Sequence, residues 1–228
     1  MTISALRDIA CTIDTTPGTR GRGRPTQSRA AATRDAVVGA AAAHFTSVGY
    51  TAASVSDIVT DSRITKGAMY FHFSSKKAVA QYLVRVWCEV LVETITTATA
   101  TAIGDDVVGG RSAHRQLVAV FRELAWYVEN DPRVRAGLLL SFESDVDENA
   151  RVYRAWTSAV TVIVEHAIPL RDPAITTITS VGLGESLCSA FVGAVQVASS
   201  LGEPESIGRR VEDLLTLWLD TAGSQSLD

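Results

Sequence analysis

Residues 54–77, which read SVSDIVTDSRITKGAMYFHFSSKK, decide the fold of this chain. Ser54 and Asp57 have the spacing of a capping box, which predicts that a short helix starts at this point. Thr65 can accept a hydrogen bond from the backbone that follows it, and this predicts a second short helix over residues 66–71. Two short helices joined by a tight turn are typical of a helix-turn-helix.

Helical patterns continue on both sides of this motif. Residues 26–48 are rich in alanine and Gly49 can end a helix, so a first helix is expected there. Residues 174–181 are rich in β-branched side chains, so a strand there is an alternative to a helix. The segment lacks the alternation and turns of a hairpin, which disfavours the strand. After Ser75 the apolar residues recur every three or four positions, which predicts six longer helices, over residues 76–102, 117–128, 132–142, 153–167, 175–201 and 207–219.

These nine helices predict an all-α fold, which we divide into three parts. Residues 1–25 lack helical periodicity and include Arg-Gly-Arg-Gly-Arg-Pro, so we expect a flexible basic arm. Residues 26–75 are expected to form a three-helix domain that contains the helix-turn-helix. Residues 76–228 are expected to form a six-helix domain that is large enough to bury its own core.

The charge of the chain is divided unevenly between these parts. The formal net charge is −4, but residues 1–77 carry ten Lys or Arg against five Asp or Glu. The remaining residues carry eleven Lys or Arg against twenty Asp or Glu. A basic module on an acidic body suits a partner made of phosphates, because phosphate contacts need local positive potential rather than a high overall pI. Chance clustering in a protein without such a partner is the alternative.

Several other classes of protein are disfavoured. No stretch approaches the roughly 18 uninterrupted apolar residues of a membrane span, and the first residues do not resemble a secretory signal. The three cysteines are scattered and show no metal-binding spacing, so we expect a cytoplasmic protein with reduced thiols, no metal and no cofactor. The nearest approach to a catalytic motif, Gly184-Glu-Ser186-Leu-Cys188, follows no strand, so an enzyme is not expected.

The helix-turn-helix residues carry a more specific resemblance. Lys66-Gly-Ala-Met-Tyr70-Phe-His72-Phe, followed by Ser75-Lys76, resembles the signature of the TetR family of bacterial repressors, and the likeness covers residues 29–80. The resemblance implies a homodimer whose second short helix enters the major groove of a near-palindromic operator. Its half-sites would be about one helical turn apart, or a multiple of that.

Residue by residue, the same resemblance implies the DNA contacts. Gly67 inside a helix costs about 1 kcal/mol relative to alanine, and a close approach of the backbone to DNA explains that cost. The basic arm resembles the minor-groove Arg-Gly-Arg-Pro peptides, although a tail that only adds non-specific affinity is an equal alternative. The expected DNA-binding residues are Arg22, Arg24, Ser54, Thr65, Lys66, Gly67, Tyr70, His72 and Lys76.

One position departs from the family pattern. The family usually has a small residue and glycine at the turn before Ile64, where this chain has Ser62 and Arg63. We therefore expect either that Arg63 adopts a left-handed backbone at some cost or that the turn differs.

The C-terminal part resembles one branch of this family. Residues 131–138, together with a tryptophan at position 156 on the following helix, are similar to the receptors for γ-butyrolactone autoregulators of actinomycetes. The resemblance implies a repressor that a small molecule of the butyrolactone, butenolide or furan type releases from DNA. Plain core packing of Trp156 is the alternative. The expected ligand-binding residues are Trp156, Leu83, Val86, Phe121, Leu138 and Val160.

Two other functions remain open at this point. A TetR-like regulator without a small-molecule ligand fits the same motifs, and so does a repressor that senses drugs or metabolites. In each case the last two helices are expected to form the dimer, because Gly182, Gly184 and Ser186 permit close approach and Val211, Leu214, Leu215 and Trp218 supply an apolar stripe.

Overall fold

The described part of the chain consists of helices joined by turns and short connections. The computed structural model describes residues 4–5, 7–8, 24–104, 111–143, 145–146, 149–167 and 179–224. Among these residues there is no strand, which confirms the all-α expectation. The helices are α2 (Arg24–Ala52), α3 (Val55–Ser62), α4 (Lys66–His72), α5 (Lys76–Gly104), α6 (Arg111–Asn130), α7 (Pro132–Leu140), α8 (Asn149–Ala167), α9 (Ser180–Leu201) and α10 (Ile207–Ser224), with a 3-10 turn at Pro204–Ser206.

The order of the helices follows the sequence, but several boundaries differ. α6 begins at Arg111 rather than at residue 117, α8 begins at Asn149 rather than at residue 153, and α10 ends at Ser224 rather than at residue 219. The first helix, α2, begins at Arg24, inside the stretch expected to be an arm. It is broken at Gly49, whose φ of 82° and ψ of 164° are not helical, and it ends at Ala52. α9 begins at Ser180 rather than at residue 175, because the hydroxyl of Thr179 caps it by accepting from the backbone N–H of Gly182. Most of the β-branched run, residues 174–178, lies outside the described residues.

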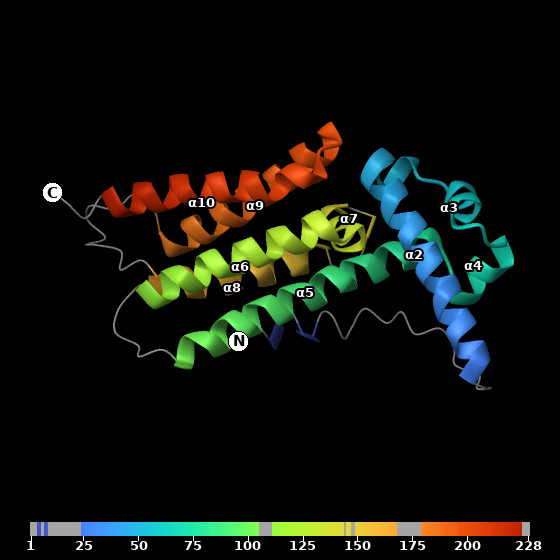
Figure 1. Cartoon of the computed structure of the whole chain (residues 1–228), viewed down its shortest axis with the longest axis horizontal. Helices are drawn as coiled ribbons and strands as arrows, with labels where there is room; N and C mark the ends of the chain where they lie inside the picture. The colour runs from blue at the N-terminus through green and yellow to red at the C-terminus, as the bar shows by residue number, and fades with distance from the viewer. Residues whose placement is uncertain are drawn as a thin grey trace.

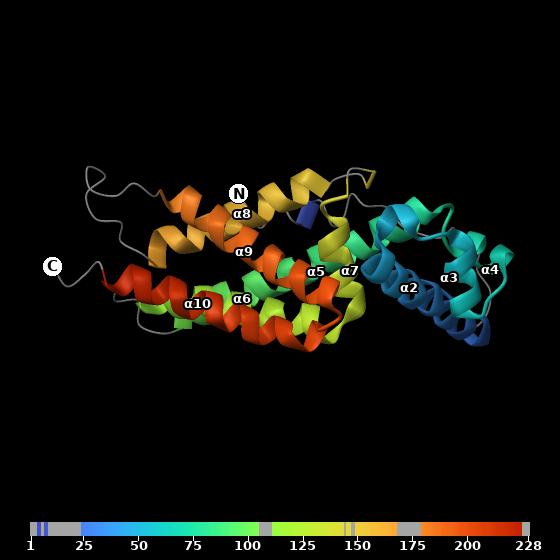
Figure 2. The same ribbon diagram turned by 90° about the horizontal axis from the view of Figure 1, so that it is seen from above.

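The helices form an elongated molecule with two ends of different character. Figure 1 shows α2, α3 and α4 gathered at one end, and α5 leading from there along the other helices. Figure 2 shows α8 on one side of the long part and α6 and α10 on the other, with α9 crossing between them. An ion pair and a hydrogen bond join α10 to α6. The guanidinium of Arg122 pairs with the carboxylate of Glu212, and the carboxylate of Glu129 accepts from the backbone N–H of Gly208 at 2.7 Å.

The short helix α7 connects the two ends. It packs on α5 and on α2, so it belongs to the long part yet contacts the first helix of the N-terminal part (Figure 1). The contact with α5 is made backbone to backbone at Gly137, since a Cβ atom there would lie 2.2 Å from the carbonyl oxygen of Leu83 and 3.0 Å from the Cβ of Trp87. Only glycine allows α5 and α7 to cross this closely.

α9 is the most apolar helix of the described part. It is long and apolar enough to cross a membrane by length and composition. Leu187, Phe191 and Val195 are buried against the rest of the protein, as in the core helix of a bundle. Gly184 also faces inward, where a Cβ atom would lie 2.5 Å from the hydroxyl oxygen of Thr161 on α8. This glycine therefore serves packing within one chain rather than the dimer contact expected from the sequence.

Candidate functional site

The helix-turn-helix is built from local hydrogen bonds that the sequence predicts. The hydroxyl of Ser54 accepts from the backbone N–H of Asp57 at 3.1 Å and donates to its carboxylate at 2.7 Å. The hydroxyl of Thr65 accepts from the N–H of Ala68 at 3.1 Å. Arg63 ends α3 with a φ of 55° and a ψ of 35°, so the departure from the family pattern produces a left-handed arginine where glycine is usual.

α4 presents one face to the interior and one to solvent. Met69 is buried beneath the helix, whereas Lys66, Gly67 and Tyr70 are exposed. A Cβ atom at Gly67 would meet no atom within 4 Å, so packing within the chain does not require glycine there. The expected DNA-binding residues at these three positions therefore share the outer face of α4.

Lys76, one of the expected DNA-binding residues, makes contacts within the chain. Its ammonium group donates to the carbonyl oxygens of Tyr50 at 2.7 Å, Ala53 at 2.9 Å and Thr51 at 3.4 Å, and it lies 4.4 Å from the centre of the Tyr50 ring. An ammonium group has three donors, and these acceptors use them. Lys76 thus joins the end of α2 to the start of α5.

His72 also differs from its neighbours on α4. It is half-buried, its Nδ1 atom is buried without a hydrogen-bond partner among the described residues, and its ring makes an edge contact with Phe71. Burial and the nearby Arg34 guanidinium lower the pKa of His72, so the imidazole is neutral near pH 7. Of the two arginines expected in the arm, Arg22 lies outside the described residues, and Arg24 begins α2 with a side chain that is not described.

The residues expected to bind a ligand lie together in the core of the long part. Trp156 on α8 is 1% exposed, and Phe121 on α6 lies 6.4 Å from it between ring centres. The other expected residues are buried or partly buried: Leu83, Val86, Leu138 and Val160. This arrangement is shared by a ligand site and by a packed core, so burial alone does not separate the two interpretations of Trp156.

Three aromatic residues that the sequence reasoning missed complete this cluster around Trp156. Trp87 on α5 meets it edge-on at 5.6 Å between ring centres, Phe191 on α9 at 5.7 Å and Tyr153 on α8 at 6.1 Å. Trp87 stands one helical turn from Leu83, so helical spacing could have identified it. We call Trp87, Phe121, Tyr153, Trp156 and Phe191 the aromatic cluster.

Polar atoms inside and beside the aromatic cluster lack partners. The indole N–H groups of Trp87 and Trp156 are buried and have no acceptor among the described residues, and the hydroxyl of the fully buried Thr94 has no partner either. Trp87 and Thr94 are seven residues apart and therefore lie on the same face of α5. An unpaired buried donor costs about 1–3 kcal/mol, so these indole N–H groups are unusual in a packed core.

Reactive and metal-binding chemistry finds no support in the described part of the chain. No group of three His, Cys, Asp or Glu side chains there could hold a metal ion. Burial raises the pKa of the Cys88 thiol to about 12 and also raises that of Cys188, so both are inert thiols at neutral pH. The hydroxyl of Ser186 donates to the carbonyl of Gly182 within α9, as in an ordinary helix rather than a nucleophile elbow.

The helix-turn-helix segment of this chain is similar to that of a known protein family. Residues 37–83 match the model of the bacterial regulatory proteins of the TetR family. This segment contains α3, α4 and the parts of α2 and α5 that pack around them. Residues 37–83 are therefore similar to the DNA-binding segment of TetR-family regulators, in agreement with the resemblance of residues 66–76.

The proteins similar to this chain include an A-factor receptor protein and a γ-butyrolactone receptor. The A-factor receptor protein of Streptomyces griseus is 30% identical over 139 residues, which cover 61% of this chain and only 45% of that receptor. A γ-butyrolactone receptor structure shares the fold with a TM-score of 0.65 at 23% identity, over 84% of this chain and 88% of that one. The TetR regulator TylP from Streptomyces fradiae has a TM-score of 0.51 at 27% identity, over 86% and 81% of the two chains.

Proposed function

We propose that this protein is a cytoplasmic, homodimeric transcriptional repressor that leaves its operator when a small signalling molecule binds in residues 76–228. The observation that carries the proposal is the pair of unpaired, buried indole N–H groups of Trp87 and Trp156, in a fold shared with γ-butyrolactone receptors. The ring carbonyl of a butyrolactone or a butenolide brings the oxygen acceptor that these donors lack, and a furan would bring it through a carbonyl substituent. Residues 26–75 would form the DNA-binding domain.

DNA binding would use the outer face of α4. Lys66 would contact a phosphate or a guanine edge, Tyr70 would donate to a phosphate, and the bare backbone at Gly67 would let the helix lie close to the groove. In this proposal Ser54 and Thr65 act mainly by capping α3 and α4, because their hydroxyl groups are already engaged.

The ligand would sit against the aromatic cluster. The Trp87 and Trp156 rings are in contact, with their centres 5.6 Å apart, so the ligand would lie beside both indoles. An apolar environment makes each hydrogen bond to a carbonyl oxygen stronger than it is in water. Apolar walls with a few convergent polar groups are the usual composition of such a site.

The route from ligand to DNA would run through Trp87. This residue touches Trp156 with its ring and borders Gly137 on α7 with its Cβ, while α7 also packs on α2. A ligand that shifts Trp87 would therefore shift the helix that holds the DNA-binding part. The ligand lowers DNA affinity only if it prefers the shifted state.

The dimer would form on the outer faces of α9 and α10. Val211 and Leu215, which the sequence assigned to this contact, are buried within the chain, and the side chain of Trp218 is not described. Large apolar side chains that remain exposed on these helices are Val181, Val197, Leu201 and Leu217. They are the surface that pairing of two copies would cover.

The test uses an operator selected from a random duplex library with the purified protein. We expect a synthetic γ-butyrolactone to release this operator, and the matching cyclic ether, which lacks the carbonyl, to be at least tenfold weaker. Trp156→Phe keeps a ring but loses the N–H, so it should weaken release by the lactone about tenfold and leave operator affinity unchanged. Trp126→Phe, at an indole that is 60% exposed on α6, is the matched control and should respond like wild type.

Two results would contradict the proposal. Equal release by the lactone and the ether would remove the assigned role of the indole N–H groups. Tight operator binding that no lactone, butenolide or furan disturbs would leave a TetR regulator without this class of ligand.

A further inference from the structure

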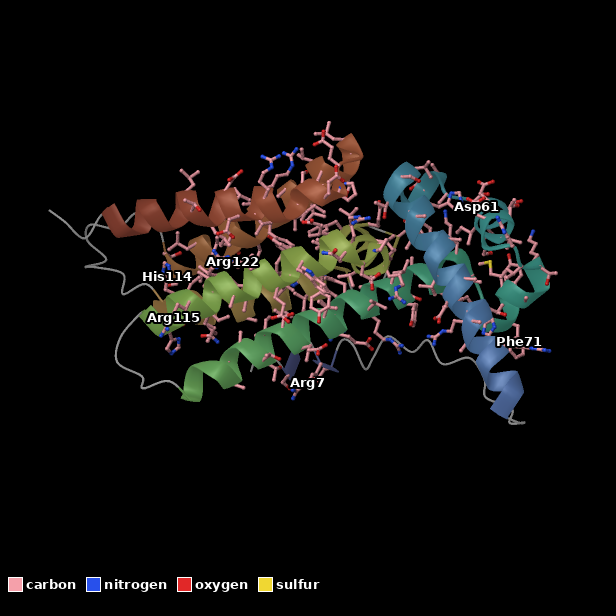
Figure 3. The ribbon with its side chains drawn as sticks, viewed as in Figure 1. Arg7, Asp61, Phe71, His114, Arg115 and Arg122 are labelled. Carbon is pink, nitrogen blue, oxygen red and sulfur yellow. The ribbon has the colours of Figure 1, made fainter. Side chains whose placement is uncertain are left out.

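Phe71 is the most exposed large apolar residue of the described chain. Its side chain is 70% exposed on α4, between the exposed Tyr70 and the half-buried His72. Figure 3 shows it at the α2–α4 end of the molecule, far from Arg122 on α6. Its ring meets the His72 ring edge-on at 5.2 Å between centres with an interplanar angle of 87°, so one neighbour constrains its orientation.

The position of Phe71 on α4 links it to Gly67. The two are four residues apart and therefore share a face, and a helical side chain leans toward the turn that precedes it. Nothing lies within 4 Å of where a Gly67 Cβ would be, so the turn in front of the Phe71 ring is open. The chain thus leaves a gap beside an exposed aromatic ring on the helix that would enter the groove.

From this placement we propose that Phe71 is a specificity-determining residue that packs against the 5-methyl group of a thymine in each operator half-site. The proposal rests on the operator binding proposed above. Among the four bases only thymine displays a methyl group in the major groove, and an apolar side chain is the group that can recognise it. The absence of a side chain at Gly67 would leave room for the edge of the thymine, and the Phe71 ring would pack against its methyl group.

A protein partner fits this residue less well. Docking surfaces for proteins are contiguous apolar patches of several hundred Å². On the exposed face of α4, Phe71 has Lys66, Gly67 and Tyr70 as neighbours, of which one is charged and one has no side chain. Phe71 is one apolar side chain among neighbours that suit phosphates and base edges. This combination fits the major groove of DNA better than it fits a protein surface.

The experiment replaces each thymine of the selected operator in turn by deoxyuridine, which removes only the methyl group. With the wild-type protein we expect one position in each half-site to lose about fourfold in affinity, the effect of unburying one methyl group. With Phe71→Ala, affinity for the unmodified operator should fall, and the deoxyuridine at that position should have no further effect. Phe71→Leu keeps an apolar side chain and should retain part of the methyl dependence.

Controls separate this inference from the proposed function. Phe142→Ala changes an exposed phenylalanine whose ring contacts Tyr153 on α8, so it should keep the wild-type deoxyuridine profile. Thermal melts should show all variants folded. If no operator is selected, the proposed function itself fails. If an operator is selected but wild type and Phe71→Ala give the same deoxyuridine profile, Phe71 does not read a methyl group and this inference alone is overturned.

Discussion

At the scale of single residues, Lys66 and Lys76 show how similar side chains take different roles. Lys66 is exposed on α4, whereas Lys76 donates to three carbonyl oxygens at the end of α2. We predict that Lys76→Met lowers the free energy of unfolding by about 2 kcal/mol, because carbonyl groups lose a charged donor. Chemical denaturation measures this change.

Lys66→Met is the matched control for that prediction. It should change stability by less than about 0.5 kcal/mol, as exposed substitutions do, and weaken operator binding by about 1–3 kcal/mol. A Lys76→Met protein as stable as wild type would show that the carbonyl contacts contribute nothing.

The stability of the protein should depend on the protonation of His72. Its pKa is lowered by burial and by Arg34, so the unfolded chain binds the proton more tightly than the folded one. The contribution of His72 is therefore complete above the unfolded pKa of about 6.5 and decreases as the pH falls below it. Between pH 7.5 and 5.5 we expect the melting temperature to fall more in wild type than in His72→Gln, and equal falls would contradict this account.

Sequence reasoning succeeded at residues whose partners are close in the chain. The caps at Ser54 and Thr65 involve atoms three residues away, so their spacing alone predicts them. The acceptors of Lys76 lie more than twenty residues earlier in the chain, and only the folded backbone brings them together. The unpaired N–H of Trp87 is likewise a property of its surroundings, which no spacing reveals.

At the scale of elements, the crossing of α5 and α7 depends on one glycine. A Cβ atom at Gly137 would lie 2.2 Å from the Leu83 carbonyl oxygen, which is backbone and cannot rotate away. We predict that Gly137→Ala forces the helices apart and destabilises the protein by about 1–3 kcal/mol. Thermal or chemical denaturation provides the measurement.

Gly39 provides the control, because it is an exposed helical glycine on α2 and a Cβ atom added there would meet no atom within 4 Å. Gly39→Ala should stabilise the protein by about 0.5–1 kcal/mol, since alanine favours the helix. If both variants were stabilised, the close crossing at Gly137 would not be a real constraint.

The sequence predicted which helices form and in what order. It predicted less well which neighbour each helix face packs against. The number and order of the described helices follow from apolar spacing and from caps such as Asp131, whose carboxylate accepts from the N–H of Arg133 at 2.9 Å. Spacing says which residues share a face but not what that face meets. Gly184 and Leu215 were therefore assigned to a dimer contact although both are buried within the chain.

At the scale of the whole molecule, the aromatic cluster and α4 lie in different parts of the elongated fold, and α7 connects these parts (Figure 1). Coupling between two sites is reciprocal, so a ligand that weakens DNA binding must itself bind more weakly to the DNA complex. Both effects come from one equilibrium between two arrangements of the protein. The ligand must therefore lower the DNA affinity by the same factor by which DNA lowers the ligand affinity.

The most direct test of the account measures that factor from both sides. Operator affinity is determined with and without a saturating synthetic γ-butyrolactone, and lactone affinity is determined with and without saturating operator. We predict that both affinities fall by one common factor, between about 5-fold and 150-fold, and that Trp87→Phe reduces it in both measurements. A lactone that binds the free protein and the operator complex equally well would contradict the central claim.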